Sequence, residues 1–409
     1  MSNSHYLARS LAFLAPILLL TFLLGLTSCG NSVFSADNSS TASPTATSTG
    51  SGGSFAYVTN VGSGFITEFK RNVTTGVLKY NTRIAAGSTS SKGGPLGIAI
   101  TSNNSFLYAG NSDDGNIYQF TVGSDGTLTP MTPPSVANGA SSFPVQVLTL
   151  SSDNVPTWLF VANNGEGTIS AYPISAAGPL GTVVTSSAPA MSGPFGLAIN
   201  STGTILYVSD NARGTIYALG FNSTTGVLSN IAGSPVNSQG TFAGSPAFLA
   251  INPSGSSLVV GDTNPAVATI SLFQIPAIGG VPTGYSPAVP TNNAAIGVVW
   301  DGSLVALSAN QNTNATAAGS ITSYILAGGS TLSPSVAVPS VNGPTNIVVD
   351  PQGAFAYSTD KGDGTINQYP LGVICQSGGS EQTICPASNV VASDPKISNP
   401  SPFGIVLTN

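Results

Sequence analysis

The sequence predicts an all-β fold built from repeats. One apolar segment close to P-x-G-I-A-I recurs along the 409 residues, at intervals of 49, 50, 52, 49, 49 and 58 residues. These intervals separate Pro95, Pro144, Pro194, Pro246, Ala295 (where Pro is lost), Pro344 and Pro402. Each unit also holds four short apolar runs, and nothing after the N-terminal segment shows sustained helical periodicity. Seven units of four strands each predict a seven-bladed β-propeller.

The four runs of a unit come in a fixed order. The first run reads "GPLGIAIT" from Gly94, "GPFGLAIN" from Gly193, "SPAFLAIN" from Ser245 and "GPTNIVVD" from Gly343, with weaker copies from Phe143 and Ala294. The second reads "FAYVTN" at 55, "LYAGN" at 107, "LYVSDN" at 206 and "FAYSTD" at 355, and the third reads "GFITEF" at 64, "GNIYQF" at 115 and "GTISAY" at 167. The fourth is weaker and follows a "TG" or "DG" turn, as in "TTGVLKY" at 74. Short, β-branched and aromatic runs bounded by Gly, Asn, Asp and Pro predict strands.

The two ends of the repeat region complement each other. The first unit opens at "FAYVTN" and so lacks its first strand, whereas the chain ends on an isolated first strand, "PFGIVLTN", from Pro402 to Asn409. An open β-solenoid is the alternative architecture, but it would need capped rather than complementary ends. We therefore expect the C-terminal strand to pair into the first blade, which would cover two open sheet edges.

The N-terminus has the pattern of an export signal. Arg9 precedes the apolar run "LAFLAPILLLTFLL", which is too short for a comfortable membrane span. The run ends in "LTSC", which resembles the lipobox of bacterial lipoproteins and implies lipidation of Cys29. An ordinary secretory signal with a chance Cys, or an uncleaved anchor, are the alternatives. We expect a signal peptide over 1–28, a Ser/Thr-rich tether over 29–53 and the propeller over 54–409. The protein would then contact the membrane only through its lipid, at the outer membrane or cell surface.

Composition narrows the partners and the chemistry. Only 6% of residues are charged and the formal net charge is -6, so nucleic acid is a poor electrostatic partner. The single histidine, His5, lies in the expected signal peptide. We therefore expect no metal site in the mature chain. Cys375 and Cys385 predict one local disulfide in an oxidising compartment, with two free thiols as the alternative. We expect a monomer without a cofactor, Ca²⁺ being the one ion considered.

The repeats also resemble a known family. "AYVTN", Ala56 to Asn60, resembles the motif that names the YVTN family, and the wider pattern is similar to the seven-bladed propellers of the lactonase family. That resemblance covers residues 54–409 and implies relatives such as 6-phosphogluconolactonases and carboxymuconate-cyclising enzymes. Such enzymes are expected to use His, Arg and acidic residues on anionic substrates. This mature chain has no His, and its arginines are Arg71, Arg83 and Arg213. No catalytic residue of the family can therefore be carried over by position.

Polar residues close the second strand of most units, whereas unit six diverges. In a propeller the loop between strands two and three shares a face with the loop before the inner strand, so these residues would gather near the channel mouth. Turn chemistry is one interpretation. A ring that holds a polar ligand or Ca²⁺ is the other. The residues are Asn60, Asn111, Asn163, Asp210, Asp262 and Asp360.

Three charged residues on the same face are candidates for catalysis. Asp210 and Arg213 could form a local salt bridge or act as acid and electrophile, and Glu166 could be a solvated loop residue or a general base. Two functions follow from these alternatives. The favoured one is a lipid-anchored module that binds a small polar ligand, an envelope glycan or a protein. The alternative is an extracytoplasmic lactonase that hydrolyses a sugar-type or uncharged lactone.

Overall fold

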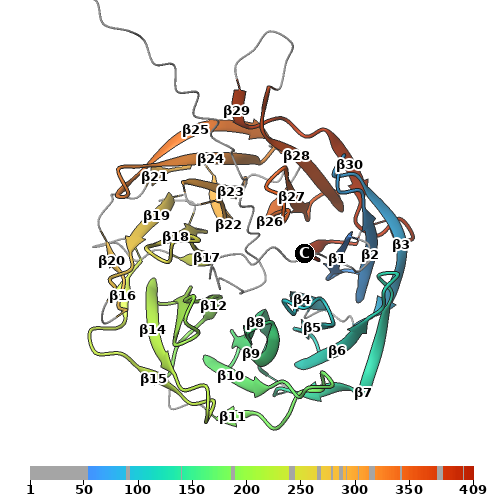
Figure 1. Cartoon of the computed structure of the whole chain (residues 1–409), viewed down its shortest axis with the longest axis vertical. Helices are drawn as coiled ribbons and strands as arrows, with labels where there is room; N and C mark the ends of the chain where they lie inside the picture. The colour runs from blue at the N-terminus through green and yellow to red at the C-terminus, as the bar shows by residue number, and fades with distance from the viewer. Residues whose placement is uncertain are drawn as a thin grey trace, which may run out of the picture.

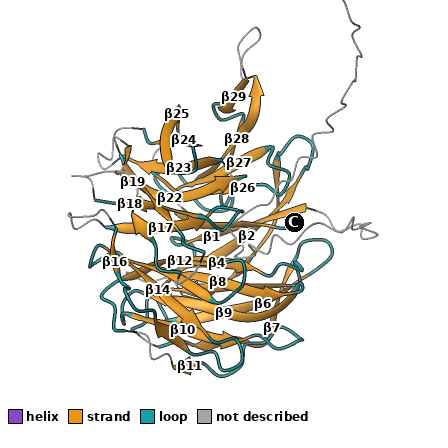
Figure 2. Cartoon of the chain, turned by 60° about the vertical axis from the view of Figure 1, so that its left-hand side comes forward, coloured by secondary structure: helices purple, strands orange, loops and turns teal. Residues whose placement is uncertain are grey.

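The chain forms seven β-sheets arranged as the blades of a ring (Figure 1). The computed structural model describes residues 54–88, 93–139, 141–185, 189–238, 245–264, 269–277, 280–284, 289–291, 293–302, 304–312, 318–340, 343–374, 381–398 and 400–409. Strands and loops, and no helices, make up these ranges (Figure 2). The predicted seven-bladed propeller is confirmed.

Each blade is an antiparallel sheet whose first strand lies next to the ring axis. From the axis outward, blade 1 contains β31 (Pro402–Leu407), β1 (Ser54–Asn60), β2 (Phe65–Arg71) and β3 (Leu78–Ala85). Blade 2 contains β4 (Pro95–Ile100), β5 (Phe106–Asn111), β6 (Asn116–Val122) and β7 (Leu128–Ala137). Blade 3 contains β8 (Pro144–Ser152), β9 (Val155–Asn163), β10 (Thr168–Pro173) and β11 (Val184–Thr185).

The outer edge is more irregular in blades 4, 5 and 7, where two outer strands pair with the same third strand. Blades 4 to 7 contain β12 (Pro194–Ile199), β13 (Ile205–Asp210), β14 (Thr215–Phe221), β15 (Leu228–Asn230) and β16 (Val236–Asn237); β17 (Pro246–Ile251), β18 (Ser257–Asp262), β19 (Thr269–Gln274), β20 (Thr283–Gly284) and β21 (Val289–Pro290); β22 (Ala294–Asp301), β23 (Val305–Gln311), β24 (Ser320–Ala327) and β25 (Thr331–Pro339); and β26 (Pro344–Val349), β27 (Phe355–Asp360), β28 (Thr365–Ile374), β29 (Glu381–Ile384) and β30 (Asn389–Ala392).

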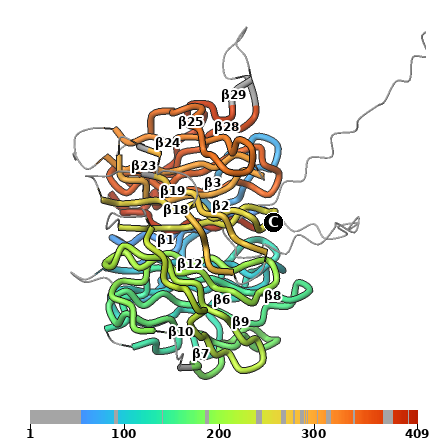
Figure 3. The backbone as a smooth tube through the Cα atoms, turned by 90° about the vertical axis from the view of Figure 1, so that its left-hand side faces the viewer, coloured from blue at the N-terminus to red at the C-terminus, as the bar shows by residue number. Residues whose placement is uncertain are grey.

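The ring closes through the C-terminal strand. β31 pairs antiparallel with β1, with Tyr57 opposite Val406, and so forms the inner strand of blade 1. The two ends of the colour scale meet at this seam (Figures 1 and 3). Beyond the strand, Phe55 N donates to Thr408 Oγ1 at 2.8 Å, which ties the last residues to the first. The expected closure by pairing of the two termini is confirmed.

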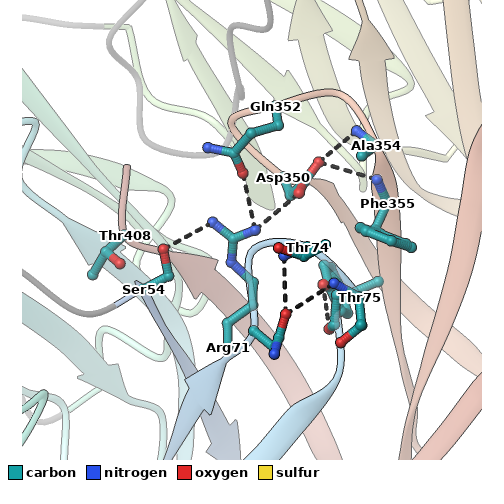
Figure 4. Close-up of polar contacts among 12 residues, drawn as sticks. Ser54, Arg71, Thr74, Thr75, Asp350, Gln352, Ala354, Phe355 and Thr408 are labelled. Atoms are coloured by element: carbon teal, nitrogen blue, oxygen red, sulfur yellow. Dashed lines mark hydrogen bonds and ion pairs between the residues drawn. The ribbon is translucent and has the colours of Figure 1, made fainter.

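Two ion pairs reinforce the seam. Arg71 at the end of β2 donates to Asp350 in the hairpin of blade 7 at 2.9 Å, and both side chains are fully buried. Gln352 and Ser54 also accept from the Arg71 guanidinium (Figure 4). On the outer strand, Arg83 pairs with Asp394 at 2.8 Å. Two of the three arginines of the repeat region therefore hold blade 1 to blade 7.

The repeated tyrosine of the second strand joins neighbouring blades. Its hydroxyl donates to the backbone carbonyl of a turn glycine in the next blade, which satisfies a buried polar group at both ends. Four blades share this contact: Tyr57 to Gly126, Tyr108 to Gly178, Tyr207 to Gly280 and Tyr357 to Gly76, at 2.6 to 3.0 Å. The tyrosine of the "YVTN" motif thus forms a hydrogen bond between neighbouring blades.

The hydroxyl residue of the same motif joins blades nearer the axis. Thr59 Oγ1 donates to Leu96 O of blade 2 at 2.7 Å and accepts from Gly404 N of its own blade at 2.8 Å. Ser209 repeats both contacts, donating to Ala247 O and accepting from Gly196 N. The motif therefore consists largely of residues that bond one blade to the next. It predicts the fold better than the activity for this reason.

The structure describes only one cysteine of the predicted disulfide. Cys385 lies directly after β29, is buried, and its N–H donates to Pro370 O at 2.9 Å. Cys375 lies outside the described residues, so the Cys375–Cys385 disulfide stays a prediction. Cys29 and the expected signal peptide and tether also lie outside them.

Candidate functional site: a pocket between blades 2 and 3

The residues that close the second strands face their own blade loops. Asp210 accepts hydrogen bonds from Ser192 N at 2.8 Å and Gly193 N at 3.0 Å, in the loop before the inner strand. It also accepts from Arg213 N in the loop after β13 at 3.1 Å. The two loops therefore meet on one face, as the sequence predicted, and the carboxylate links them.

Other members of this set contact the loop before their inner strand or, for Asn60, the third strand of its own blade. Asn111 donates to Ala86 O at 2.7 Å, Asp262 accepts from Ser245 N at 2.9 Å, and Asn60 donates to Thr67 Oγ1 at 2.9 Å. All six residues are buried, with exposed fractions of 2% or less. These contacts support the turn interpretation. A role in holding a ligand or Ca²⁺ stays a prediction.

Blade 6 also has a residue at this position. The sequence was interpreted as diverging there, yet Asn310 pairs with Ala295 in the register that Asn111 and Pro95 have in blade 2. Asn310 Nδ2 donates to Thr322 Oγ1 at 2.8 Å. Asn310 is therefore the equivalent residue of blade 6, where Ala295 stands in place of the repeated proline.

Asp360 differs electrostatically from the rest of the set. It accepts from the hydroxyls of Ser340 and Ser358 at 3.0 and 3.1 Å, and from the side chain of Asn367. Burial raises the pKa of Asp360 to about 7, although the Ser340 hydrogen bond opposes the shift. Since the side chain is fully buried, this titration belongs to the interior of blade 7 and not to the channel mouth.

The centre of the ring is nearly filled. Phe248 packs against Phe195 and Phe403, with ring centroids 5.2 and 6.0 Å apart. The cavity among the inner strands measures only about 10 Å³, which is at the lower limit for one water molecule. Glycine permits this close approach, because a Cβ at Gly97 would lie 2.7 Å from Gln146 Cα. This cavity is therefore too small for a substrate.

A larger pocket, of about 470 Å³, lies between blades 2 and 3. Its polar side chains come from the loop after β7, from the loop before β10 and from β10 itself. Apolar side chains lie in β11 and in the segments on either side of it. Among its lining residues are Asn138, Gly139, Glu166, Thr168, Ser170, Tyr172, Val183, Val184, Pro189 and Ala190. Glu166, a candidate from the sequence, thus lines this pocket.

A hydrogen-bonded network fixes the floor of this pocket. Tyr172 Oη donates to Asn138 Oδ1 at 2.8 Å, and Asn138 Nδ2 donates to Asn163 Oδ1 at 2.6 Å. Asn163 Nδ2 in turn donates to Ser170 Oγ at 2.8 Å and Thr168 Oγ1 at 3.1 Å. Burial raises the pKa of Tyr172 to about 12, and the negative charge of Glu166 adds to the shift. The floor is therefore preorganised, and its phenol is neutral at physiological pH.

Glu166 lies above this floor at the mouth of the pocket. Its side chain is exposed, and its carboxylate lies against Gly139, where an added Cβ would be 2.5 Å from Glu166 Oε1. Gly139 has a φ of 110°, a conformation that favours glycine. The bare backbone at this position gives the carboxylate its room.

Arg213 supports the wall of the pocket from the neighbouring blade. Its guanidinium donates to Ala190 O at 2.7 Å, to Ser192 Oγ at 2.8 Å and to Tyr217 Oη at 3.1 Å. It lies 4.0 Å from Asp210 Oδ2, so the local salt bridge considered from the sequence is present at the limit of contact. Because Asp210 is buried under its loops, the two residues do not form an open acid–electrophile pair.

Comparisons with known proteins agree with this architecture. Residues 55–197 match the family model described as "Lactonase, 7-bladed beta-propeller". The match covers the first blades of the propeller and ends in β12 of blade 4. No curated protein matches the chain.

Solved structures share the fold of this propeller at low sequence identity. A candidate 6-phosphogluconolactonase from Bacteroides fragilis has 16% identity and a TM-score of 0.67, over 90% of this chain and 100% of that one. The periplasmic gluconolactonase of Pseudomonas aeruginosa has 15% identity and a TM-score of 0.65, over 87% of this chain and 99% of that one. At this level the likeness shows the fold alone.

The sequence patterns predicted only one residue of the pocket between blades 2 and 3. They indicated Glu166 but not Asn138, Thr168, Ser170 or Tyr172, although the polar alternation of "GTISAY" marks three of them. Within the described ranges, no group of three or more His, Cys, Asp or Glu side chains could hold a metal ion. No helix of the described part is long and apolar enough to cross a membrane.

Proposed function

We propose that this propeller is a non-catalytic binding module of the cell envelope, anchored through a lipid on Cys29. Its ligand, a small polar molecule or an envelope glycan, would occupy the pocket between blades 2 and 3. The observation that carries this proposal is the lining of the pocket, which combines the Asn138 amide, hydroxyls and the Glu166 carboxylate with apolar side chains. Such a combination of an apolar surface with a few placed polar groups is typical of ligand sites.

The positions of the titratable groups argue against hydrolysis. A general acid or base at neutral pH needs a pKa near 7 and must reach the substrate. Burial raises the pKa of both Glu68 and Asp360 to about 7. Both side chains are almost fully buried between strands, so neither could contact a lactone in the pocket.

The binding function can be tested with the full chain in a non-glycosidic detergent. We expect saturable binding of envelope polysaccharide or peptidoglycan fragments, measured by calorimetry, and no turnover of a lactone panel at neutral pH. The absence of binding across such a panel would overturn the proposal.

A lactonase activity is the second candidate, supported by the place of Glu166 in the pocket. It requires hydrolysis of an uncharged lactone that is lost in Glu166→Ala while the fold persists. Arg213→Ala should also lower the rate, because Arg213 holds the Ala190 carbonyl at the pocket wall. A flat lactone panel would exclude this candidate.

The lipid anchor is tested separately from the ligand. The residue after Cys29 is Gly30 and not Asp, which in a Gram-negative cell favours the outer membrane. We expect the chain to incorporate labelled fatty acid and to fractionate with membranes, and Cys29→Ser to lose both properties. Membrane fractionation of Cys29→Ser without label would show an uncleaved anchor instead.

A further inference from the structure

We infer that the pocket between blades 2 and 3 selects uncharged, hydroxyl-rich ligands, in particular neutral sugars, and that Glu166 excludes their acidic counterparts. This inference rests on the proposed binding function. It adds the chemical class of the ligand and the residue that determines specificity.

The first argument is the hydrogen-bonding capacity of Glu166. An ionised carboxylate only accepts hydrogen bonds, and its two oxygens suit a pair of adjacent hydroxyl donors. The side chain is exposed at the mouth, and Gly139 leaves room for the carboxylate beside the backbone. A ligand with vicinal hydroxyls supplies the donors that this carboxylate lacks within the described part of the chain.

The second argument is the hydroxyl of Thr168. Thr168 Oγ1 accepts from Asn163 Nδ2 at 3.1 Å, which leaves its O–H to donate to a ligand. The side chain is exposed at the start of β10, next to Glu166 in the lining. The mouth thus offers one donor beside two acceptor oxygens, a pattern that matches hydroxyl groups, which both donate and accept.

The third observation is an apolar surface beside these groups, where β11 pairs with β10. Val183 is 40% exposed and lies with Val184 and Pro189 along the pocket. The C–H face of a sugar ring can cover such a surface while its hydroxyls face the polar side. A small, fully polar ion would leave these apolar side chains exposed to water.

The fourth argument is charge. None of the lining residues that the structure describes is cationic, and Glu166 gives the pocket a negative charge. Arg213 contacts the wall through the Ala190 carbonyl, and Asp210 lies 4.0 Å from its guanidinium. A carboxylate or phosphate on the ligand would therefore face Glu166 without a compensating cation, which we expect to weaken binding about tenfold.

Matched pairs of disaccharides test this selection on the full chain. The probes are glucose, galactose, mannose and N-acetylglucosamine disaccharides, each paired with the derivative in which one hydroxymethyl group is a carboxylate. Calorimetry should show that a neutral member binds and that its acidic partner binds about tenfold more weakly. Glu166→Gln should bring the two affinities within about twofold, and Thr168→Val should weaken the neutral member.

Asp153→Asn is the matched control. Asp153 is an exposed turn residue of the same blade with a φ of 51°, which Asn also tolerates, and it lies in the β8–β9 hairpin away from the pocket. It removes the same charge, so it should leave the neutral-to-acidic ratio unchanged. An acidic disaccharide that binds as tightly as its neutral partner overturns the selection while the binding function stands. A panel in which neither member of any pair binds overturns the binding function itself.

Discussion

At the residue scale, Glu68 is a buried acid at the position where blades 2 and 7 have glutamine, Gln119 and Gln368. In blade 2, Gln119 Oε1 accepts from Leu180 N at 2.9 Å and its amide donates to Pro133 O at 2.7 Å. Glu68 of blade 1 accepts from Leu128 N at 3.2 Å, but its Oε2 has no hydrogen-bond partner among the residues that the structure describes. Burial raises the pKa of Glu68 to about 7, and the exposed Asp125 adds to the shift. A protonated Glu68 can donate as glutamine does, and an ionised one cannot.

This position predicts a pH-dependent effect of Glu68→Gln. The pKa of Glu68 is higher in the folded state, about 7, than its ordinary value of 4.5. Its stabilising contribution is therefore present below about pH 4.5 and lost as the pH rises through 7. Glu68→Gln should raise the free energy of unfolding by about 1–3 kcal/mol at pH 8 and change it little at pH 4.5. Chemical denaturation at both pH values measures this, and an equal effect at both would contradict the explanation.

At the element scale, the second strand carries most of the fold's information. Within "YVTN", Tyr57 and Thr59 each contact the next blade, and Asn60 contacts its own third strand. Because each residue type has one repeated task, the motif could be interpreted without a structure. The pocket could not, because it depends on how closely Asn138 of blade 2 approaches Asn163 of blade 3. No local pattern encodes that approach.

The inter-blade tyrosine contact predicts a defined loss of stability. Tyr108→Phe removes the 2.6 Å hydrogen bond to Gly178 O and leaves that carbonyl without this donor. We expect the free energy of unfolding to fall by about 1–3 kcal/mol. Tyr80→Phe is the control, since Tyr80 contributes a ring contact with Phe69 that phenylalanine keeps. Equal effects of the two substitutions, measured by urea denaturation, would show that the hydroxyl contact contributes nothing.

At the scale of the whole molecule, the ring is closed by strand pairing and by buried charge. The sequence predicted the pairing because the missing first strand and the isolated last strand complement each other. It did not predict the Arg71–Asp350 ion pair, whose members lie 279 residues apart, because an aspartate in a hairpin is ordinarily explained by its turn contacts. Asp350 does both, because its Oδ1 accepts from Ala354 N at 2.7 Å while its Oδ2 faces Arg71.

Removing one partner of this pair should destabilise the whole ring. Arg71→Met leaves the Asp350 carboxylate buried without its cation, for which we expect a loss of about 3–5 kcal/mol. Lys79→Met removes an exposed cation of the same blade and should change stability by less than about 0.5 kcal/mol. Thermal unfolding of the two variants compares them directly. A stable Arg71→Met variant would mean that the strand pairing alone closes the ring.

The central claim is that this propeller binds a ligand between blades 2 and 3 and does not hydrolyse it. Thr168→Trp would fill the mouth of the pocket from the exposed start of β10 without altering the channel or the seam. The most direct measurement is a titration of wild type and Thr168→Trp with envelope glycan, together with lactone turnover by both. We predict saturable binding to the wild type, its loss in Thr168→Trp, and no turnover by either protein. Binding that survives Thr168→Trp, or lactone hydrolysis by the wild type, would contradict the account.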